Sequence, residues 1–433
     1  MSNDDLQDPL PAGEDQPGRG LSRIVDPIAD FMRVETSSGI ILLIAAAVAL
    51  IWANIPGHTY EEFWHIHLTL GFGEFAVNES LEAWVNDGLM TIFFFVVGLE
   101  IKRELVLGEL RDPKTAALPG MAAIGGMVVP ALLYFALNTS GEGASGWAIP
   151  VATDIAFVLG VIALLSKSIP KGIKLFMLTL AIIDDIGGIL IIAIFYSEDL
   201  SLVWLIPAIV GCILIVVFTR LKVKYDAVYV IIGIVIWYCA LKSGVHPTIA
   251  GVAIGLLVPT RPIKGRMVLD DLEHKLAPIT SFVIVPIFAL ANAGVPLGLG
   301  SLKAAFTSPI AWGIILGLVV GKTVGVTVFS AGGLRARIGK LTTGMAFKHV
   351  AGASMLSGIG FTVSLFIASL SFDAPGQEEL LDQAKIGILT ASIVAGVLGA
   401  FLAILASRGS KPGGDNSEVA TNGPDGGELA TET

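Results

Sequence analysis

The chain has 433 residues, of which 54% are hydrophobic and only 15% are charged, and its mean hydropathy is +0.78. Soluble proteins carry about 25% charged residues, so this composition excludes an ordinary soluble enzyme and gives no reason to expect a nucleic-acid partner. The formal net charge of −10 is concentrated at the ends, since residues 1–36 hold eight acids and 409–433 hold five. Both tails, 1–36 and 407–433, are polar and contain Gly and Pro, so we predict that they are mostly disordered.

The apolar residues fall into runs of the length that crosses a bilayer, about 17–25 residues. We therefore predict an all-α polytopic membrane protein whose transmembrane domain covers 37–406. Its twelve predicted spans are 37–56, 84–102, 115–137, 147–166, 174–196, 202–219, 226–241, 245–259, 277–295, 308–331, 349–372 and 385–406.

The distribution of basic residues gives the orientation. Of the 27 Lys and Arg residues, 23 lie in or beside the segments on one side, three (Lys242, Lys303, Lys385) lie on the other side, and Lys322 lies inside a span. Cytoplasmic loops collect Lys and Arg, so both termini are predicted to be cytoplasmic. No short apolar core followed by a cleavage site is present, and we expect no removable signal peptide.

Predicted spans 3–5 and 10–12 form two triplets, and each span of the first lies seven spans before its equivalent in the second. Successive spans cross the membrane in alternating directions, and seven is odd, so equivalent helices in the two triplets run in opposite directions. The middle helix of each triplet is predicted to be interrupted, by Pro150 before Thr153–Asp154 in helix 4 and by Gly358 and Gly360 in helix 11. Either feature alone also fits a kinked packing helix. Paired interruptions in inverted repeats, beside buried charges, favour a transporter site near the membrane midplane.

Several ionisable residues lie within the spans. Asp184 and Asp185 are residues 11 and 12 of the 23-residue run 174–196, about 16 Å from its start. Short Asp side chains cannot reach water from that depth, and neighbouring helical residues point about 100° apart, so the two carboxylates should have different surroundings. One could meet Lys322 while the other faces a water-filled cavity. The other acids of the spans are Asp154, Asp87 near an outer end, and Glu100 near an inner end, with Glu104 just beyond it.

The hydrophobic body, roughly residues 33–406, resembles NhaA-type Na⁺/H⁺ antiporters. The resemblance rests on several stretches in the family's order: VNDGLMTIFFFVVGLEIKREL, GWAIPVATDIAFVLGV, LAIIDDIGGI, LKSGVHPTIAGV, FALANAGV, GKTVG and GIGFTVSLFIASL.

The resemblance implies roles for these residues. Asp185 is expected to be the main cation and proton carboxylate, and Asp184 its partner, which pairs with Lys322 and carries or gates protons. Thr153 and Asp154 are expected where two interrupted helices cross. Asp154 and Lys322 there would balance the partial charges of the unpaired helix ends.

The resemblance also implies a pH-responsive entrance at the cytoplasmic face, formed by Glu100, Glu104, Glu273 and His274, with His246 as a further pH-sensing candidate. Two departures from the family pattern stand out: Ala277 lies where a second histidine is expected, and Thr323 follows Lys322 where proline is expected.

The outer loop 66–77 partly alternates in polarity around Gly71 and Gly73, which predicts a short hairpin. Such a hairpin is marginal alone and could pair with a second protomer, and the resemblance favours a homodimer.

Na⁺ (and Li⁺)/H⁺ antiport in a bacterial inner membrane is therefore the leading function, predicted to be electrogenic, active at alkaline pH and free of cofactors. The alternatives are another ion-coupled transporter, such as a sodium–organic acid symporter, and an intramembrane aspartyl protease. A symporter should show a cluster of Ser, Thr and Asn with a basic residue that could hold an organic anion, and of these we find only Lys322. A protease needs aspartates on separate helices, and its Gly-x-Gly-Asp signature is missing.

Overall fold

The computed structural model describes residues 37–407, apart from residues 72, 166–168, 198–199, 224, 264 and 342–344. The predicted tails, 1–36 and all of 407–433 except its first residue, lie outside the described residues. The described chain is mostly helical, and seven of its helices are long and apolar enough to cross a bilayer. The protein is therefore an all-α polytopic membrane protein.

The seven long helices fall into two kinds. Five are regular α-helices: α5 (Pro113–Leu137), α7 (Lys171–Phe195), α8 (Leu202–Arg220), α9 (Asp226–Ser243) and α18 (Glu378–Ser407). The other two contain a π-helical segment: α11 (Val268–Ile279), η5 (Thr280–Ile284) and α12 (Val285–Asn292) form one, and α14 (Pro309–Leu316), η6 (Gly317–Gly321) and α15 (Lys322–Arg335) form the other.

Two further helix pairs are bent at a short break. The 3₁₀ segment η4 (Glu142–Val151) meets α6 (Ile155–Leu164) at an angle of 40°. In the second pair, α16 (Phe347–Ala353) and the 3₁₀ segment η7 (Ser354–Gly358) meet α17 (Phe361–Ser371) at 46°. The backbone N–H of Asp154 donates to Ile359 O at 2.7 Å, so the two breaks lie directly against each other.

The remaining elements are shorter. Two are short apolar helices, Ser37–Ala53 and α10 (Pro247–Leu257). A third helix is a continuous run of three segments: α3 (Leu81–Ala83), the π-helical η2 (Trp84–Leu89) and α4 (Met90–Val106). Strands β1 (His67–Leu70) and β2 (Val77–Ser80) pair antiparallel, with His67 opposite Ser80. Small helices in the loops are α2 (Thr59–Trp64), η1 (Gly73–Phe75), η3 (Glu109–Arg111) and α13 (Leu299–Thr307).

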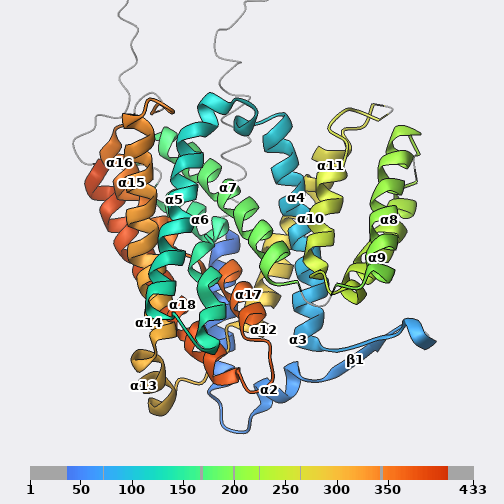
Figure 1. Cartoon of the computed structure of the whole chain (residues 1–433), viewed down its shortest axis with the longest axis horizontal. Helices are drawn as coiled ribbons and strands as arrows, with labels where there is room; N and C mark the ends of the chain where they lie inside the picture. The colour runs from blue at the N-terminus through green and yellow to red at the C-terminus, as the bar shows by residue number, and fades with distance from the viewer. Residues whose placement is uncertain are drawn as a thin grey trace, which may run out of the picture.

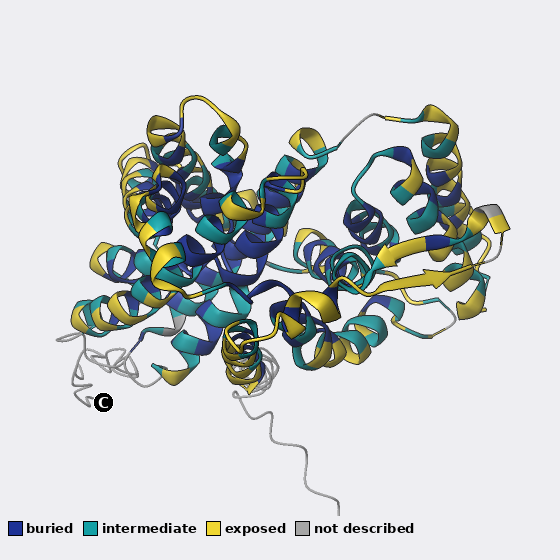
Figure 2. Cartoon of the chain, turned by 90° about the horizontal axis from the view of Figure 1, so that it is seen from below, coloured by how far each residue is buried: buried dark blue, intermediate teal, exposed yellow. Residues whose placement is uncertain are grey.

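The helices stand in two groups (Figure 1). Helices α8, α9 and α10 stand with α4 and α11 on one side, and α5, α14, α15, α16 and α18 stand on the other. Figure 2 shows the hairpin projecting beside the first group, with buried residues concentrated inside the helical body. In the most apolar stretch of α7 half of the residues are buried, whereas in that of α8 only 17% are. Helix α7 is therefore central in the bundle and α8 is peripheral.

Candidate functional site

Helix α7 places Asp184 against a buried base, Lys322 at the start of α15. The Lys322 ammonium donates to Asp184 Oδ2, and it also donates to Thr153 Oγ1 at 2.7 Å. Thr153 Oγ1 in turn lies 2.5 Å from Asp184 Oδ2 and 2.9 Å from Ser357 O, and can donate its single proton to either oxygen. The Lys322 and Asp184 side chains are both 0% exposed, so this ion pair is sealed from solvent.

Asp154 occupies the crossing of the two breaks. Its carboxylate accepts hydrogen bonds from Phe157 N (3.1 Å), Thr362 N (3.0 Å) and Thr362 Oγ1 (2.6 Å). These donors belong to the first turns of α6 and α17, so one carboxylate caps two helix N-termini, where negative charge is favoured. The Lys322–Thr153 contact lies beside Ser357 O in the last turn of η7, so the base lies near a helix C-terminal end.

The glycines of the second break serve close packing. Gly360 has an ordinary negative φ of −98°, so the chain does not need its conformational freedom there. A Cβ at Gly360 would lie 3.0 Å from Leu318 Cδ2 and 3.2 Å from Ala152 O, and a Cβ at Gly358 would collide with Leu318 O. Both glycines therefore allow the second break to pack against η6, and Gly360 also allows contact with the first break. Pro150 lies in η4, and its ring faces Gly317 of the same η6 segment.

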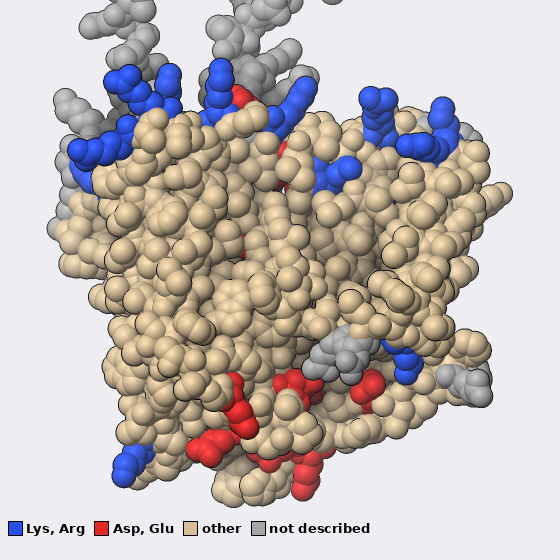
Figure 3. All heavy atoms as spheres, in the orientation of Figure 1, with Lys and Arg blue, Asp and Glu red and all other residues tan. Residues whose placement is uncertain are grey.

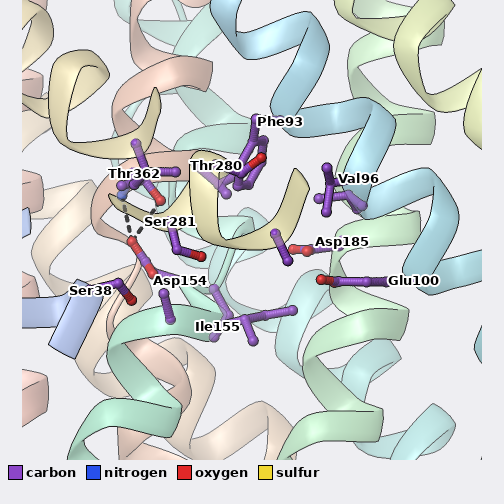
Figure 4. A pocket seen from close by; sticks show the side chains of 16 residues that line it. Ser38, Phe93, Val96, Glu100, Asp154, Ile155, Asp185, Thr280, Ser281 and Thr362 are labelled. Carbon is purple, nitrogen blue, oxygen red and sulfur yellow. Dashed lines mark hydrogen bonds between the residues drawn. The ribbon is translucent and has the colours of Figure 1, made fainter. Parts of the chain in front are cut away.

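Asp185, one residue beyond Asp184, faces a different environment. It lines a cavity of about 70 Å³, together with Glu100, Thr153 and Asp154, and its Oδ1 is buried without a hydrogen-bond partner among the described residues. In Figure 4 the side chains of Asp185, from α7, and Glu100, from α4, reach into the cavity with their carboxylates near each other. A cavity of this size holds more than one water molecule. Because hard cations take oxygen ligands, a buried carboxylate oxygen without a donor is suited to bind either such a cation or a proton.

The predicted entrance residues do not form one cluster. Glu100 faces the cavity, whereas Glu273 pairs with Arg103, at 2.6 Å between Oε1 and Nη1. Glu104 acts on Glu273 electrostatically, and His274 is exposed. The expectation that Glu273 and His274 lie in a loop before a span at 277 is wrong: α11 starts at Val268, because its amphipathic first turns extend the helix beyond the apolar run.

His246 lies with Asp87, away from the other pH-sensing candidates. Its Nε2 is 3.5 Å from Asp87 Oδ1, and its Nδ1 is 2.8 Å from Thr248 Oγ1. Asp87 and Glu100 are thirteen residues apart on one continuous helix, a separation of about 20 Å. His246 therefore belongs to the opposite end of the bundle from Arg103 and Glu273.

A further set of polar contacts ties α7 to both broken pairs near that opposite end. Tyr196 Oη donates to Ser145 O at 2.9 Å and accepts from Ser371 Oγ at 3.0 Å. Ser145 Oγ lies 2.9 Å from Ser371 O. These bonds join the end of α7 to η4 and to the last turn of α17 on the side away from Glu100. No motif singled out these three residues, because each is ordinary in its own segment.

Three π-helical segments were also missed, and each touches a polar site. The segment η2 contains Asp87, η5 begins at Thr280 on the cavity wall, and η6 directly precedes Lys322. Single-turn π segments are frequent at functional sites, because the extra residue shifts the helical register locally.

Ionisable residues packed where two broken membrane helices cross define an ion-coupled membrane transporter. The family model described as Na⁺/H⁺ antiporter 1 matches residues 29–403, and the chain belongs to that family. It is 47% identical over 382 residues to the Na(+)/H(+) antiporter NhaA of Haemophilus ducreyi, covering 88% of this chain and 97% of the relative. It is 45% identical over 383 residues to the Na(+)/H(+) antiporter NhaA 1 of Clostridium beijerinckii, covering 88% of this chain and 95% of the relative.

Proposed function

We propose that the protein is a secondary active antiporter that extrudes cytoplasmic Na⁺, and also Li⁺, in exchange for entering H⁺. The observation that carries the proposal is Asp185, whose buried Oδ1 has no hydrogen-bond donor in the described part of the chain and which faces a cavity next to the crossing of two broken helices. The sequence relatives named as antiporters support the same function. A sodium–organic acid symporter is not favoured, because the cavity lining contains no basic residue.

In the proposed mechanism, Na⁺ and H⁺ compete for Asp185. With the cavity open to the cytoplasm, Na⁺ reaches the carboxylate past Glu100 and displaces a proton. The bundle then rearranges about the crossing, the contacts of Tyr196 break, and the cation leaves on the other side. A proton from that side then binds Asp185 and is carried back to the cytoplasm. A second proton carried at the Asp184–Lys322 pair would make the exchange electrogenic, and competition makes the transporter more active at alkaline pH.

The proposed topology has twelve spans with both termini in the cytoplasm of a bacterial inner membrane. Within the described residues, the seven long helices and the two broken pairs account for nine spans. Ser37–Ala53, the helical run from Leu81 to Val106, and Pro247–Leu257 supply the other three. The inverted repeats are then α5 to α7 and α14 to α18. Lys and Arg side chains gather at the end opposite the hairpin, and Asp and Glu at the hairpin end (Figure 3), which supports a cytoplasmic assignment for the basic end.

The entrance is proposed to respond to pH through the charged residues at this basic end. The Arg103–Glu273 ion pair links α4 to α11, the two helices that supply Glu100 and Ala277 to the cavity wall. Titration at this end would alter the spacing of those helices. Because Ala277 stands where the family pattern has a second histidine, the exposed His274 is the histidine that we assign to the proposed entrance.

The protein is proposed to form a homodimer through the hairpin. All four residues of β1 are exposed, and within the described residues β1 pairs only with β2. The outer edge of such a two-stranded sheet presents unpaired backbone groups that a second copy can pair with.

Everted membrane vesicles with a preset ΔpH test the proposed function. Addition of Na⁺ or Li⁺ should dissipate ΔpH, K⁺ should have no effect, and a potential-sensitive dye reports whether charge moves. Vesicles carrying Asp185→Asn at equal protein level are the control, because the amide keeps the size of the side chain but cannot exchange a proton. Failure of every cation to dissipate ΔpH in wild-type vesicles would reject antiport.

A further inference from the structure

Thr280 lies on the wall of the Asp185 cavity in an unusual piece of helix. It begins η5, the π segment in the middle of the helical run Val268–Asn292, and it is 4% exposed. Pro278 and Pro286 flank the segment, and neither can donate a backbone hydrogen bond. The π register therefore occurs where the regular bonding pattern is already interrupted, and it sets the direction in which Thr280 points.

The Thr280 hydroxyl is buried and has no hydrogen-bond partner within the described part of the chain. Other threonines in the long helices behave differently. Thr179 donates to Leu175 O at 2.9 Å and Thr323 to Val319 O at 2.6 Å, the usual bond to the carbonyl four residues earlier. An unsatisfied buried hydroxyl costs free energy, so its presence on a cavity wall calls for a ligand.

A second unsatisfied oxygen lines the same cavity. Asp185 Oδ1 is also buried without a donor, and it comes from α7 while Thr280 comes from η5. Figure 4 shows both side chains at the cavity together with Glu100. The carboxylate supplies charge, and the hydroxyl supplies a neutral oxygen from another helix. That combination is what a hard monovalent cation takes from a protein.

We propose that the Thr280 hydroxyl is an oxygen ligand of the transported cation while that cation occupies the Asp185 cavity, and that it favours Na⁺ over Li⁺. This inference rests on the proposed antiport function. Na⁺ is larger than Li⁺ and accepts more oxygen ligands, so an additional neutral ligand benefits Na⁺ more. The proton needs only Asp185, so Thr280 affects cation binding and leaves proton binding in place.

The test compares Thr280→Val, Thr280→Ala and Thr280→Ser. Valine matches the shape of threonine without the hydroxyl, alanine relieves any packing strain, and serine keeps the hydroxyl. Thr179→Val is the matched control, because it removes a threonine hydroxyl from α7 that bonds to its own helix. The apparent KM for Na⁺ and for Li⁺ is measured in everted vesicles at one alkaline pH, and Na⁺ binding to the detergent-purified protein is measured by calorimetry.

Thr280→Val and Thr280→Ala should raise the KM for Na⁺ about three- to tenfold, because a water molecule replaces part of the lost contact. The KM for Li⁺ should rise less, so the ratio of the two constants moves toward Li⁺. Thr280→Ser and Thr179→Val should stay near wild type. An unchanged ratio in both Thr280→Val and Thr280→Ala, by transport and by calorimetry, would overturn the assignment, as would an equal loss in Thr280→Ser. Absence of cation-driven ΔpH dissipation in wild-type vesicles would instead reject antiport itself.

Discussion

Asp184 and Asp185 should respond to neutralisation in opposite ways. In Asp184→Asn the Lys322 ammonium loses its carboxylate counter-charge and keeps only neutral acceptors, Thr153 Oγ1 and the amide oxygen of the new side chain, in a site where the lysine side chain is 0% exposed. Removing one partner of a buried pair costs about 3–5 kcal/mol. For a bundle of this size that corresponds to a fall in the melting temperature of about 4–6 °C.

Asp185→Asn should leave the melting temperature unchanged or raise it. Asp185 Oδ1 has no donor to lose, and the change removes a buried charge that no base neutralises directly. The same substitution should abolish Na⁺-driven proton movement. Adding Lys322→Met to Asp184→Asn removes both charges of the pair and should recover most of the lost stability, although not the transport.

The melting temperatures are measured by tryptophan fluorescence of the detergent-purified protein, and transport is measured in vesicles at matched protein levels. The reasoning fails if Asp184→Asn melts like wild type while Asp185→Asn is strongly destabilised. It also fails if the double variant is less stable than Asp184→Asn alone.

Three further outcomes are expected. Because H⁺ and Na⁺ compete for Asp185, the apparent KM for Na⁺ should rise about tenfold per unit of acidification while the maximal rate changes little; a maximum that collapses even at saturating Na⁺ would point instead to the Arg103–Glu273 end. Tyr196→Phe removes the ties to Ser145 and Ser371, so amide hydrogen exchange over η4 should accelerate about fivefold, and an unchanged rate would show that these bonds do not hold the outer side closed. Deleting residues 66–77 should convert dimers to monomers in native gels, and dimers that persist would exclude the hairpin as the interface.

The sequence predicted those features that depend on local chemistry. Charge and hydropathy were enough to place most of the long helices, and the 100° rotation between adjacent residues separated the surroundings of Asp184 from those of Asp185. Contacts between distant segments were harder. The Arg103–Glu273 pair joins two helices through one bond of 2.6 Å, and no local pattern in either segment specifies that partner.

The π segments show a second limit of sequence reasoning. Hydropathy predicted one uniform span over 277–295, whereas η5 changes the helical register for five residues, Thr280–Ile284. Pro278 and Pro286 were visible in the sequence, but proline in a membrane helix is compatible with a simple kink as well as with a π segment. The position of Thr280 on the cavity wall therefore emerged only from the three-dimensional structure.

The arrangement of the two aspartates also bears on why exchange would be coupled. The Asp184–Lys322 pair is neutral as a unit, so the charge near the cavity changes chiefly at Asp185. Na⁺ and H⁺ each cancel the charge of Asp185, and a second proton on the Asp184–Lys322 pair would add one positive charge to the proton-loaded form alone. With neither bound, Asp185 is an unpaired carboxylate at a depth where a charge costs about 2.5–3.5 kcal/mol or more. Reorientation of the unloaded form is thereby disfavoured, so the site crosses when it holds one cation or the other. Adjacent acids with separate partners thus give the proposed antiporter one carboxylate that Na⁺ and H⁺ exchange, and beside it an ion pair that can carry the second proton of an electrogenic exchange.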